Sequence, residues 1–324
     1  MPDIDALRSF DAIKILADPR RLEILRLLMA APATLTQLGR RMKRSPAWIR
    51  HHLTTMQAAG LVQLHEVRVV GRATEKYYRA VSAALLLEQL VLPKSRVPVV
   101  VFSGSHDPAL QAAAEKLGGR QMFLTLYVGS LNGLTNLRQG VCHVSGIHLL
   151  DESGEYNRPY VRHFFADRDV ELVTLAHRAQ GLMLAPGNPR SIRRLEDLTW
   201  PGIRFVNRNA GSGTRLWLEH ALRKGGIDAR AIPGYSLQVS THTEAAALIH
   251  SGKADVALGL QASAREFGLD FIPLFEERYD LVLPARSEKM LAPFLDFIQT
   301  GAFRSRTNAM TGYNTAHSGE LIPL

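Results

Sequence analysis

Apolar positions recur at helical spacing in the first sixty residues and then give way to strand-like runs. The segment 45–60 carries apolar residues at i, i+4 and i+7, which predicts an amphipathic helix with one buried stripe. Ser45-Pro46 suits the start of this helix, and Gly60 suits its end. The predicted stripe consists of Ile49, Leu53 and Met56.

Two further helices are expected before this one. Asp18-Pro19 marks the start of the first, and either Thr34 or Thr36 can cap the second. After the third helix, two β-rich runs surround Gly71, a pattern that predicts a hairpin. Helices followed by a basic hairpin predict a winged helix-turn-helix over residues 1–80. The basic side chains of the hairpin suit contact with a DNA backbone; they are Arg68, Arg72 and Lys76.

Residues 81–92 are rich in leucine, and the pattern predicts a helix. This helix either covers one domain or forms a dimer interface that also links the domains, and we favour the second hypothesis. Pro93 and Pro98 mark the start of the next domain. The sequence therefore predicts a linking and dimerisation segment over residues 81–95.

From residue 96 to residue 324, β-branched runs alternate with helical segments. Strands that alternate in this way with helices of about 10–15 residues predict an α/β fold with largely parallel sheets. The chain as a whole is thus expected to be α/β, with a smaller helical domain in front.

Several strand ends run directly into a turn rich in Gly, Ser and Thr that starts a helix. Such a turn presents backbone N–H groups and a hydroxyl at the positive end of a helix, which suits a small anion. Serine and threonine are also good helix caps, so the same pattern is compatible with capping alone. None of these turns has the P-loop or dinucleotide-binding spacing, which counts against a nucleotide. The turns lie at residues 103–107, 129–133, 210–215 and 240–244.

Charge and composition narrow the class of protein. The formal net charge is +9, and residues 1–92 hold fourteen Lys and Arg against eight Asp and Glu. A basic small domain is typical of a protein that binds DNA phosphates. The single cysteine, Cys142, excludes a disulfide framework and fits a reducing cytoplasm. Without a signal-peptide pattern or an apolar run of about 18 residues, we expect a cytoplasmic protein with no membrane contact.

The stretch ADPRRLEILRLL…SPAWIRHHLTTMQAAGLVQLHEVRVVGRATEKYYRA closely resembles the ArsR-type winged-helix repressors. The resemblance implies a homodimer, or a higher homo-oligomer, that places each third helix in a major groove of palindromic double-stranded DNA. It assigns the DNA contacts to Ser45, Trp48, Arg50, His51 and Thr54 on the helix and to Arg72 and Lys76 on the wing.

Many members of that family sense metals through a cysteine-containing pair on the third helix. Here the corresponding residues are HHLTT, without a thiol, so we expect no metal site. His51 and His52 are adjacent and point to different faces of the helix. We expect His51 on the DNA face and His52 packed under the wing.

The second half resembles the type II periplasmic-binding-protein fold, in particular the PBP-like domains fused to molybdenum-related regulators and molybdopterin biosynthesis proteins. The similarity is carried by GSLNGL, SGIHLLD, EYN, GLMLAPGNPRSI, RFVNRNAGSGTR, HTEAAALIHSGKADVALG and LDFIPLFEERYDLVLP. RFVNRNAGSGT also resembles a turn of tungstate-binding transport proteins. The resemblance implies two lobes that close by hinge motion, with crossovers near 175–185 and 280–284. Lobe I would cover 96–182 and 282–324, and lobe II 183–281.

The same resemblance assigns a set of ligand contacts. Arg215 is the expected counter-charge for an anion, although a salt bridge along its own helix is the alternative. Asp107 and Glu244 are expected to offset helix dipoles, and Tyr279 suits either a hinge or a contact. The expected ligand residues are Ser103, Ser105, Ser130, His148, Ser212, Gly213, Thr214, Arg215, Thr241 and Thr243.

These patterns leave several functions to compare. The first is a one-component transcription regulator that senses a small oxyanion, with molybdate or tungstate as the expected ligand and no other cofactor. The second is the same regulator with a small organic acid or a molybdopterin-type ligand. An enzyme has less support, because the chain has no GxSxG, HExxH or Cys-His pattern and we expect no catalytic residues.

Overall fold

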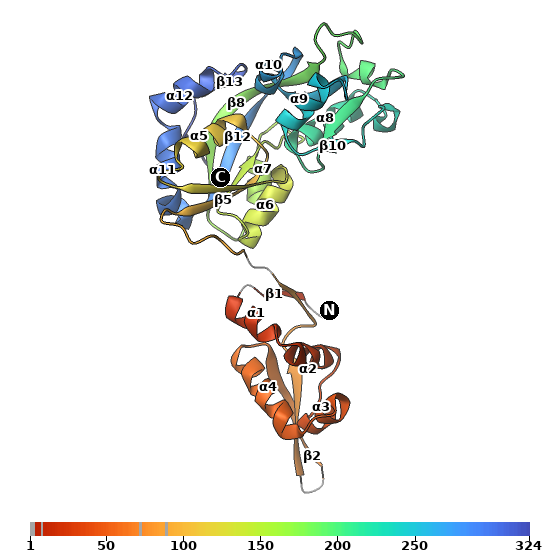
Figure 1. The fold of residues 1–324 in the computed structure, drawn as a ribbon, viewed down its shortest axis with the longest axis vertical. Helices are drawn as coiled ribbons and strands as arrows, with labels where there is room; N and C mark the ends of the chain where they lie inside the picture. Colours follow the sequence, from red (N-terminus) through yellow and green to blue (C-terminus); the bar gives the residue numbers. More distant parts are fainter. Residues whose placement is uncertain (1–3, 8, 71–72, 88–89) are drawn as a thin grey trace. The chain divides into compact units, whose positions relative to one another are not determined.

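The computed structural model describes residues 4–7, 9–70, 73–87 and 90–324. The chain divides into two compact units, Met1–Val91 and Leu92–Leu324, each with its own apolar core (Figure 1). Residues 81–91, which we expected to form part of a separate linker, belong to the first unit.

The helices of the first unit begin where capping side chains stand. They are α1 (Phe10–Leu16), α2 (Pro19–Ala30), α3 (Leu35–Met42) and α4 (Pro46–Ala58). Asp18 caps α2 and Ser45 caps α4, as predicted. A reciprocal pair of hydrogen bonds between Thr34 and Gln37 selects Thr34 over Thr36 as the cap of α3.

The core of this unit lies between the helices and the hairpin. The stripe predicted on α4 is confirmed, because Ile49, Leu53 and Met56 are buried and belong to one apolar cluster with residues of α2 and α3. The predicted hairpin is also present, formed by β2 (Val62–Val70) and β3 (Ala73–Ala80) in antiparallel register. Together these elements make the winged helix-turn-helix that the sequence predicted.

The leucine-rich segment after the hairpin differs from the prediction. We expected a helix over 81–92, but β4 (Ala84–Leu87) pairs in parallel with β1 (Ile4–Leu7). The prediction of a helix was wrong because a short run of consecutive apolar residues suits either a strand or a helix. Pairing with a strand some eighty residues earlier in the chain decided between them.

The second unit is built around a curled mixed sheet. Its strands follow the order β10-β9-β11-β8-β12-β7-β5-β6, with β13 and β14 paired to β8. The strands are β5 (Val99–Gly104), β6 (Met122–Tyr127), β7 (Val144–Ile147), β8 (Val170–Leu184), β9 (Phe205–Arg208), β10 (Gln238–Val239), β11 (Val256–Leu260), β12 (Asp270–Pro284), β13 (Tyr313–Asn314) and β14 (Leu321–Ile322).

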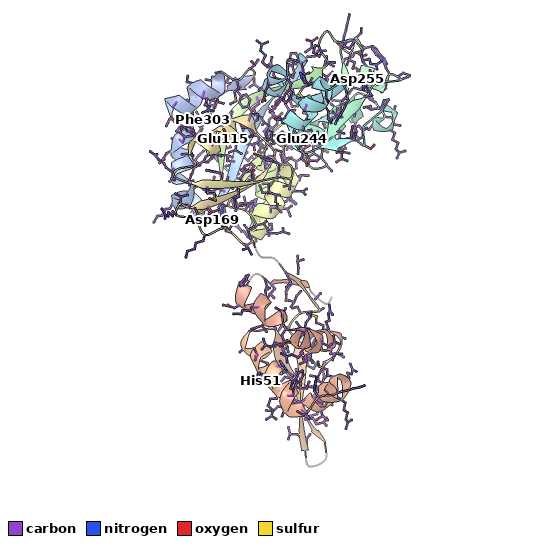
Figure 2. The ribbon with its side chains drawn as sticks, in the orientation of Figure 1. His51, Glu115, Asp169, Glu244, Asp255 and Phe303 are labelled. Atoms are coloured by element: carbon purple, nitrogen blue, oxygen red, sulfur yellow. The ribbon has the colours of Figure 1, made fainter. Side chains whose placement is uncertain are left out.

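The sheet is mixed and not largely parallel as predicted, because the long strands β8 and β12 pair in antiparallel register. The predicted α/β class is confirmed, and helices cover the sheet. They are α5 (Pro108–Lys116), α6 (Ser130–Gln139), α7 (Arg158–Phe164), α8 (Gly213–Lys224), α9 (His242–His250), α10 (Gln261–Glu266), α11 (Glu288–Ile298) and α12 (Gly301–Asn308). Thr300 caps α12 and starts it separately from α11, and Phe303 of α12 packs into the core (Figure 2). Among the described residues, no helix is both long and apolar enough to cross a membrane.

Two long antiparallel strands, β8 and β12, connect the two halves of the sheet (Figure 1). One half, with β5, β6 and β7, is joined to β12 at Asp280–Val282. The other half, with β9, β10 and β11, is joined to β8 at residues 180–184. These halves are the two lobes, and the register shift between Tyr279 and Asp280 lies where β12 passes between them. The second crossover therefore comes slightly earlier than predicted. The sequence pattern did not predict most of β8 as a strand, because polar residues interrupt its apolar run.

Candidate ligand and DNA sites

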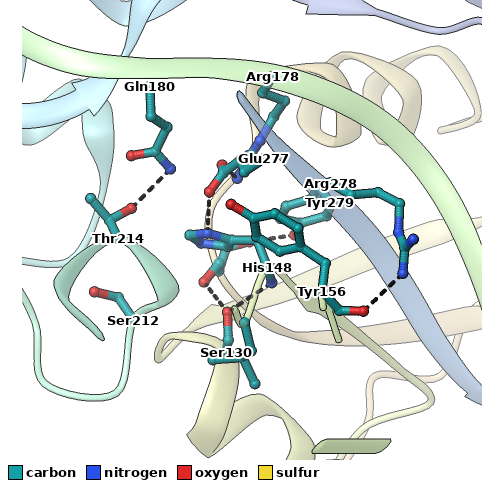
Figure 3. Close-up of polar contacts among 12 residues, drawn as sticks. Ser130, His148, Tyr156, Arg178, Gln180, Ser212, Thr214, Glu277, Arg278 and Tyr279 are labelled. Atoms are coloured by element: carbon teal, nitrogen blue, oxygen red, sulfur yellow. Dashed lines mark hydrogen bonds and ion pairs between the residues drawn. The ribbon is translucent and has the colours of Figure 1, made fainter. Parts of the chain in front are cut away.

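The turns after β5 and β7 and before α6 meet in the first lobe. The hydroxyl groups of Ser105 and Ser130 lie 2.9 Å apart and share a hydrogen bond. The backbone N–H of His148 donates to Ser130 Oγ at 3.2 Å (Figure 3). All three residues are buried, so the sequence predicted a group that the structure does bring together.

The start of α8 in the second lobe lies against these turns. A Cβ on Gly213 would fall 2.0 Å from the carbonyl oxygen of His148, so this contact requires glycine. Thr214 accepts a hydrogen bond from Gln180 Nε2 of β8 at 3.1 Å (Figure 3), and Ser212 caps the helix. The predicted residues 212–214 therefore face His148 across the two lobes.

Backbone and side-chain hydrogen bonds hold the two lobes together at these turns. Asn209 Nδ2 donates to the carbonyl of Val128 at 3.0 Å, and the N–H of Leu131 donates to the carbonyl of Gly211 at 3.1 Å. The lobes are therefore closed on one another in this structure. The side chains between them are buried, and β8 and β12 are the strands that connect the lobes.

An ion network lies beside His148. Arg178 of β8 donates to Asp107 Oδ2 at 2.8 Å and also to Glu277 of β12. Glu277 Oε2 is 2.6 Å from His148 Nδ1, and the hydroxyl of Tyr313 donates to Asp107 at 2.6 Å. Asp107 also caps α5, as predicted from the sequence. The network is shielded from solvent and links both crossover strands to the first lobe.

The charges of this network determine its protonation. Burial by itself raises the pKa of the Glu277 carboxyl, but Arg178 and His148 outweigh it and lower that pKa to about 2. Burial lowers the pKa of His148, and the Arg178 and Arg208 cations lower it further against the opposing effect of Glu277. At neutral pH, Glu277 is thus a carboxylate and His148 is a neutral ring.

Arg208, at the end of β9, was not among the predicted ligand residues. Its side chain is only 1% exposed, and Nη2 donates to the carbonyl of Ser240 at 2.7 Å. Its Nε and Nη1 atoms have no hydrogen-bond partner among the described residues. Burial and the nearby Arg178 lower the pKa of Arg208 to about 10, so it remains a cation at neutral pH. A buried cation with two unused donors is suited to bind an anion.

His242, the first residue of α9, lies in the same interior. It is fully buried, and neither ring nitrogen has a partner among the described residues. Burial lowers its pKa well below the usual range, and the charges of Arg208 and Arg178 act in the same direction. His242 lies within the predicted turn at 240–244, where Thr241 and Thr243 were the expected ligand residues.

Arg215 pairs along its own helix in this structure. Its Nε donates to Glu219 at 2.9 Å within α8, and its guanidinium lies 5.2 Å from the centre of the Tyr235 ring. The alternative weighed for this residue, a salt bridge along its own helix, therefore describes it. Arg208 stands in the same quoted stretch, RFVNRNAGSGTR, and its position at the end of a buried strand was the signal that distinguishes it.

The remaining predicted ligand residues are Ser103, Thr241 and Thr243. Ser103 Oγ accepts from Asn136, and Thr241 caps α9 together with Glu244, so both hydroxyls serve local structure. Thr243 and His106 line a surface groove of about 490 Å³ between α5, α9 and α10. Because His106 is itself nearly buried, this groove lies at the edge of the interior cluster.

The predicted DNA-binding face on α4 is largely exposed. Arg50, His51 and Thr54 project to solvent, and His51 is marked in Figure 2. Ser45 is exposed too, and its hydroxyl accepts from the N–H of Trp48 as the cap of α4. Three of the assigned side chains are therefore free to reach a base edge.

Trp48 and its neighbour His52 lie partly or wholly inside the unit. The Trp48 ring is half-buried, 4.2 Å from the ring of His52. We expected His52 under the wing. Burial lowers the pKa of its ring, Asp18 opposes this effect, and the charges of Arg20, His51 and Arg21 lower the pKa further. The surroundings of His52 that the structure describes are therefore the Trp48 ring and the charged side chains at the start of α2.

On the wing, Lys76 is exposed, as a DNA-backbone contact requires. Arg68 pairs with Glu66 and lies 4.6 Å from the centre of the Tyr77 ring. Arg72, the other predicted wing contact, lies outside the described residues. The hairpin therefore offers Lys76 as the predicted wing contact that the structure describes.

A basic group that was not predicted from the sequence lies at the turn between α3 and α4. Gly39 lets this turn pack closely, since a Cβ there would lie 2.7 Å from the carbonyl oxygen of Arg44. Exposed cations in this position suit contacts with phosphates. The run RRMKR was their sequence signal, and the exposed residues are Arg40, Arg41, Lys43 and Arg44.

The fold and these sites define a class of protein in which a DNA-binding domain is fused to a two-lobed ligand-binding domain. Residues 18–63 match the arsR family of bacterial regulatory proteins, and residues 111–299 match the PBP superfamily domain. The chain therefore belongs to the PBP superfamily and carries an ArsR-type helix-turn-helix.

Relatives are found among bacterial proteins. YvgK of Bacillus subtilis is 35% identical over 228 residues, which are 69% of this chain and 74% of YvgK. A protein from the 5′ region of a 2Fe-2S ferredoxin gene of Clostridium pasteurianum is 33% identical over 112 residues, 33% of this chain and 97% of its own length. The bromide-bound regulatory domain of HypT from Salmonella typhimurium is 11% identical, with a TM-score of 0.47 over 64% of this chain and 97% of that one.

Proposed function

We propose that the protein is a one-component transcription regulator whose second unit senses a small oxyanion between its lobes. The observation that carries this proposal is Arg208, a buried cation with two N–H groups that have no partner among the described residues. Each buried donor without a partner costs about 1–3 kcal/mol. An oxyanion that accepts from both donors stabilises the closed lobes, so binding and closure are coupled.

The proposed regulator binds palindromic DNA as a dimer in the cytoplasm. The exposed face of α4 and the basic turn before it support DNA binding. Apolar side chains on the surface of the first unit support a second copy of the chain as its partner, because water exposure of such side chains is unfavourable. These side chains are Phe10 on α1 and Leu86 and Leu87 on β4, each more than half exposed.

Molybdate and tungstate are the candidate ligands that the sequence resemblance suggests, and a small organic acid is the alternative. The buried positive charge of Arg208 attracts an anion of either kind. We propose binding rather than catalysis for this site, because the Ser105 and Ser130 hydroxyls bond to each other and to a backbone N–H. Neither hydroxyl bonds to the ring of His148 in the described contacts.

Thermal unfolding of the full chain with a panel of anions tests this proposal. Molybdate, tungstate, sulfate, phosphate, lactate and propionate would each be added to the wild type, to Arg208→Met and to Arg215→Met. We expect at least one anion to raise the Tm of the wild type and of Arg215→Met, but not of Arg208→Met. A panel without any shift, or shifts of equal size in all three proteins, would contradict the proposed site.

A further inference from the structure

The hydrogen bonds of Glu277 fix the tautomer of His148. One oxygen of this carboxylate accepts from Arg178, and the other lies 2.6 Å from His148 Nδ1. A carboxylate has no proton to donate, so His148 Nδ1 carries the proton of this hydrogen bond. In a neutral ring, the other nitrogen, Nε2, is then a hydrogen-bond acceptor.

His148 Nε2 is buried and has no partner among the described residues. The charged or titratable groups around the ring are Arg178, Arg208, Glu277 and His242, and the Tyr279 ring stacks on it at 5.9 Å. Both arginines disfavour a second proton on His148, and burial lowers its pKa as well. The interior between the lobes therefore contains donors on Arg208 and an acceptor on His148.

We infer that His148 Nε2 accepts a hydrogen bond from the ligand, so that the site selects an anion that also carries an O–H group. This inference rests on the proposed function and narrows its ligand class. The ionised oxygens of the ligand bind the N–H groups of Arg208, and its hydroxyl donates to His148. A ligand without a hydroxyl leaves Nε2 unpaired, or places an ionised oxygen against its lone pair.

Common anions divide clearly by this criterion. Near neutral pH, phosphate and arsenate retain an O–H group, whereas sulfate, selenate, molybdate and tungstate are fully ionised. A 2-hydroxy acid such as lactate combines a carboxylate with a hydroxyl, whereas propionate has the carboxylate alone. The inference therefore ranks molybdate and tungstate below protonated oxyanions and hydroxy acids, and the two sources of the hydroxyl can be tested separately.

Isothermal titration calorimetry on the full chain compares matched probes: phosphate with sulfate, arsenate with selenate, and lactate with propionate. An unpaired buried acceptor costs enough that we expect a preference of at least about tenfold for the hydroxyl-bearing member of one or more pairs. Phosphate and arsenate preference would identify an inorganic ligand, and lactate preference a hydroxy acid.

Two variants assign the preference to His148. Glutamine can accept or donate, so His148→Gln should reduce the preference to less than about threefold. His177→Gln is the matched control, because His177 on β8 also pairs with a carboxylate, Glu276, but at the surface. We expect this control to keep the wild-type preference. If His148→Gln does not fold, the affinities of the matched probes for the wild type, together with the number of protons taken up on binding, still test the inference.

The number of protons taken up on binding distinguishes this mechanism from the opposing one. In the opposing mechanism, His148 takes up a proton and donates a hydrogen bond to a fully ionised anion. Titrations in buffers of different ionisation enthalpy measure protons taken up on binding. Molybdate or sulfate binding as tightly as phosphate, with uptake of about one proton, would overturn the inference but leave the proposed oxyanion sensor intact. If no probe binds, the proposed function fails, and the inference fails with it.

Discussion

Replacing Arg208 with methionine separates ligand binding from folding. The guanidinium is buried, and two of its N–H groups are available to a ligand. Methionine keeps most of the aliphatic volume and removes the charge. Because burial works against the charged form of Arg208, the ligand-free variant should unfold at the same temperature as the wild type or a higher one.

The loss of affinity follows from the two donors. Hydrogen bonds to charged groups contribute about 1.5–3 kcal/mol each, so losing both weakens binding by about 3–6 kcal/mol. This corresponds to a factor of about 10² to 10⁴ in Kd. Arg215→Met removes a pair along one helix, which contributes at most about 0.5 kcal/mol, and a hydrogen bond of 3.4 Å to the backbone carbonyl of Arg208. Neither contact involves the Arg208 guanidinium.

The assay is thermal unfolding at a ligand concentration 100 times the wild-type Kd. Mass action then stabilises the wild type by about 2.7 kcal/mol, or roughly 5–11 °C for a domain of this size. A hundredfold weaker variant keeps about 0.4 kcal/mol, roughly 1–2 °C. If Arg208→Met retained the full shift while Arg215→Met lost it, the assignment of the counter-charge to Arg208 would be refuted.

Three further predictions concern DNA, coupling and pH. In the double variant Arg50→Ala and His51→Ala, specific DNA binding measured by fluorescence anisotropy should be weaker by about 1–3 kcal/mol per lost base contact. Unchanged affinity would mean that another face of the unit contacts the bases. A bound anion should change operator affinity by about 1–3 kcal/mol, and a long flexible insertion after Pro93 should remove this effect if the units are rigidly coupled. The pKa of His106 is lowered to about 4, first by burial, so its unfolded form binds a proton at a higher pH than its folded form. The free energy of unfolding should therefore fall as pH drops from about 6.5 toward 4. Urea unfolding at pH 7 and at pH 5 measures this difference, and equal free energies at the two pH values would contradict the role given to His106 and the other buried histidines.

The sequence alone determined the features that depend on near neighbours in the chain. Asp18 and Ser45 cap their helices because a capping side chain bonds to N–H groups only two or three residues away. The buried stripe of α4 follows from helical periodicity, and the α/β class follows from alternating runs. Four loop regions were correctly chosen as helix starts, although not all of their hydroxyls serve a ligand.

Tertiary structure decided what depends on partners far apart in the chain. β4 is a strand because β1 lies beside it, and β8 extends through its polar residues because β12 pairs with its whole length. Arg208 and Arg215 lie in one short stretch, yet only the fold turns one into the interior and the other toward Glu219. The proton on His148 is likewise set by Glu277, 129 residues away, because burial makes a hydrogen bond between distant residues decisive.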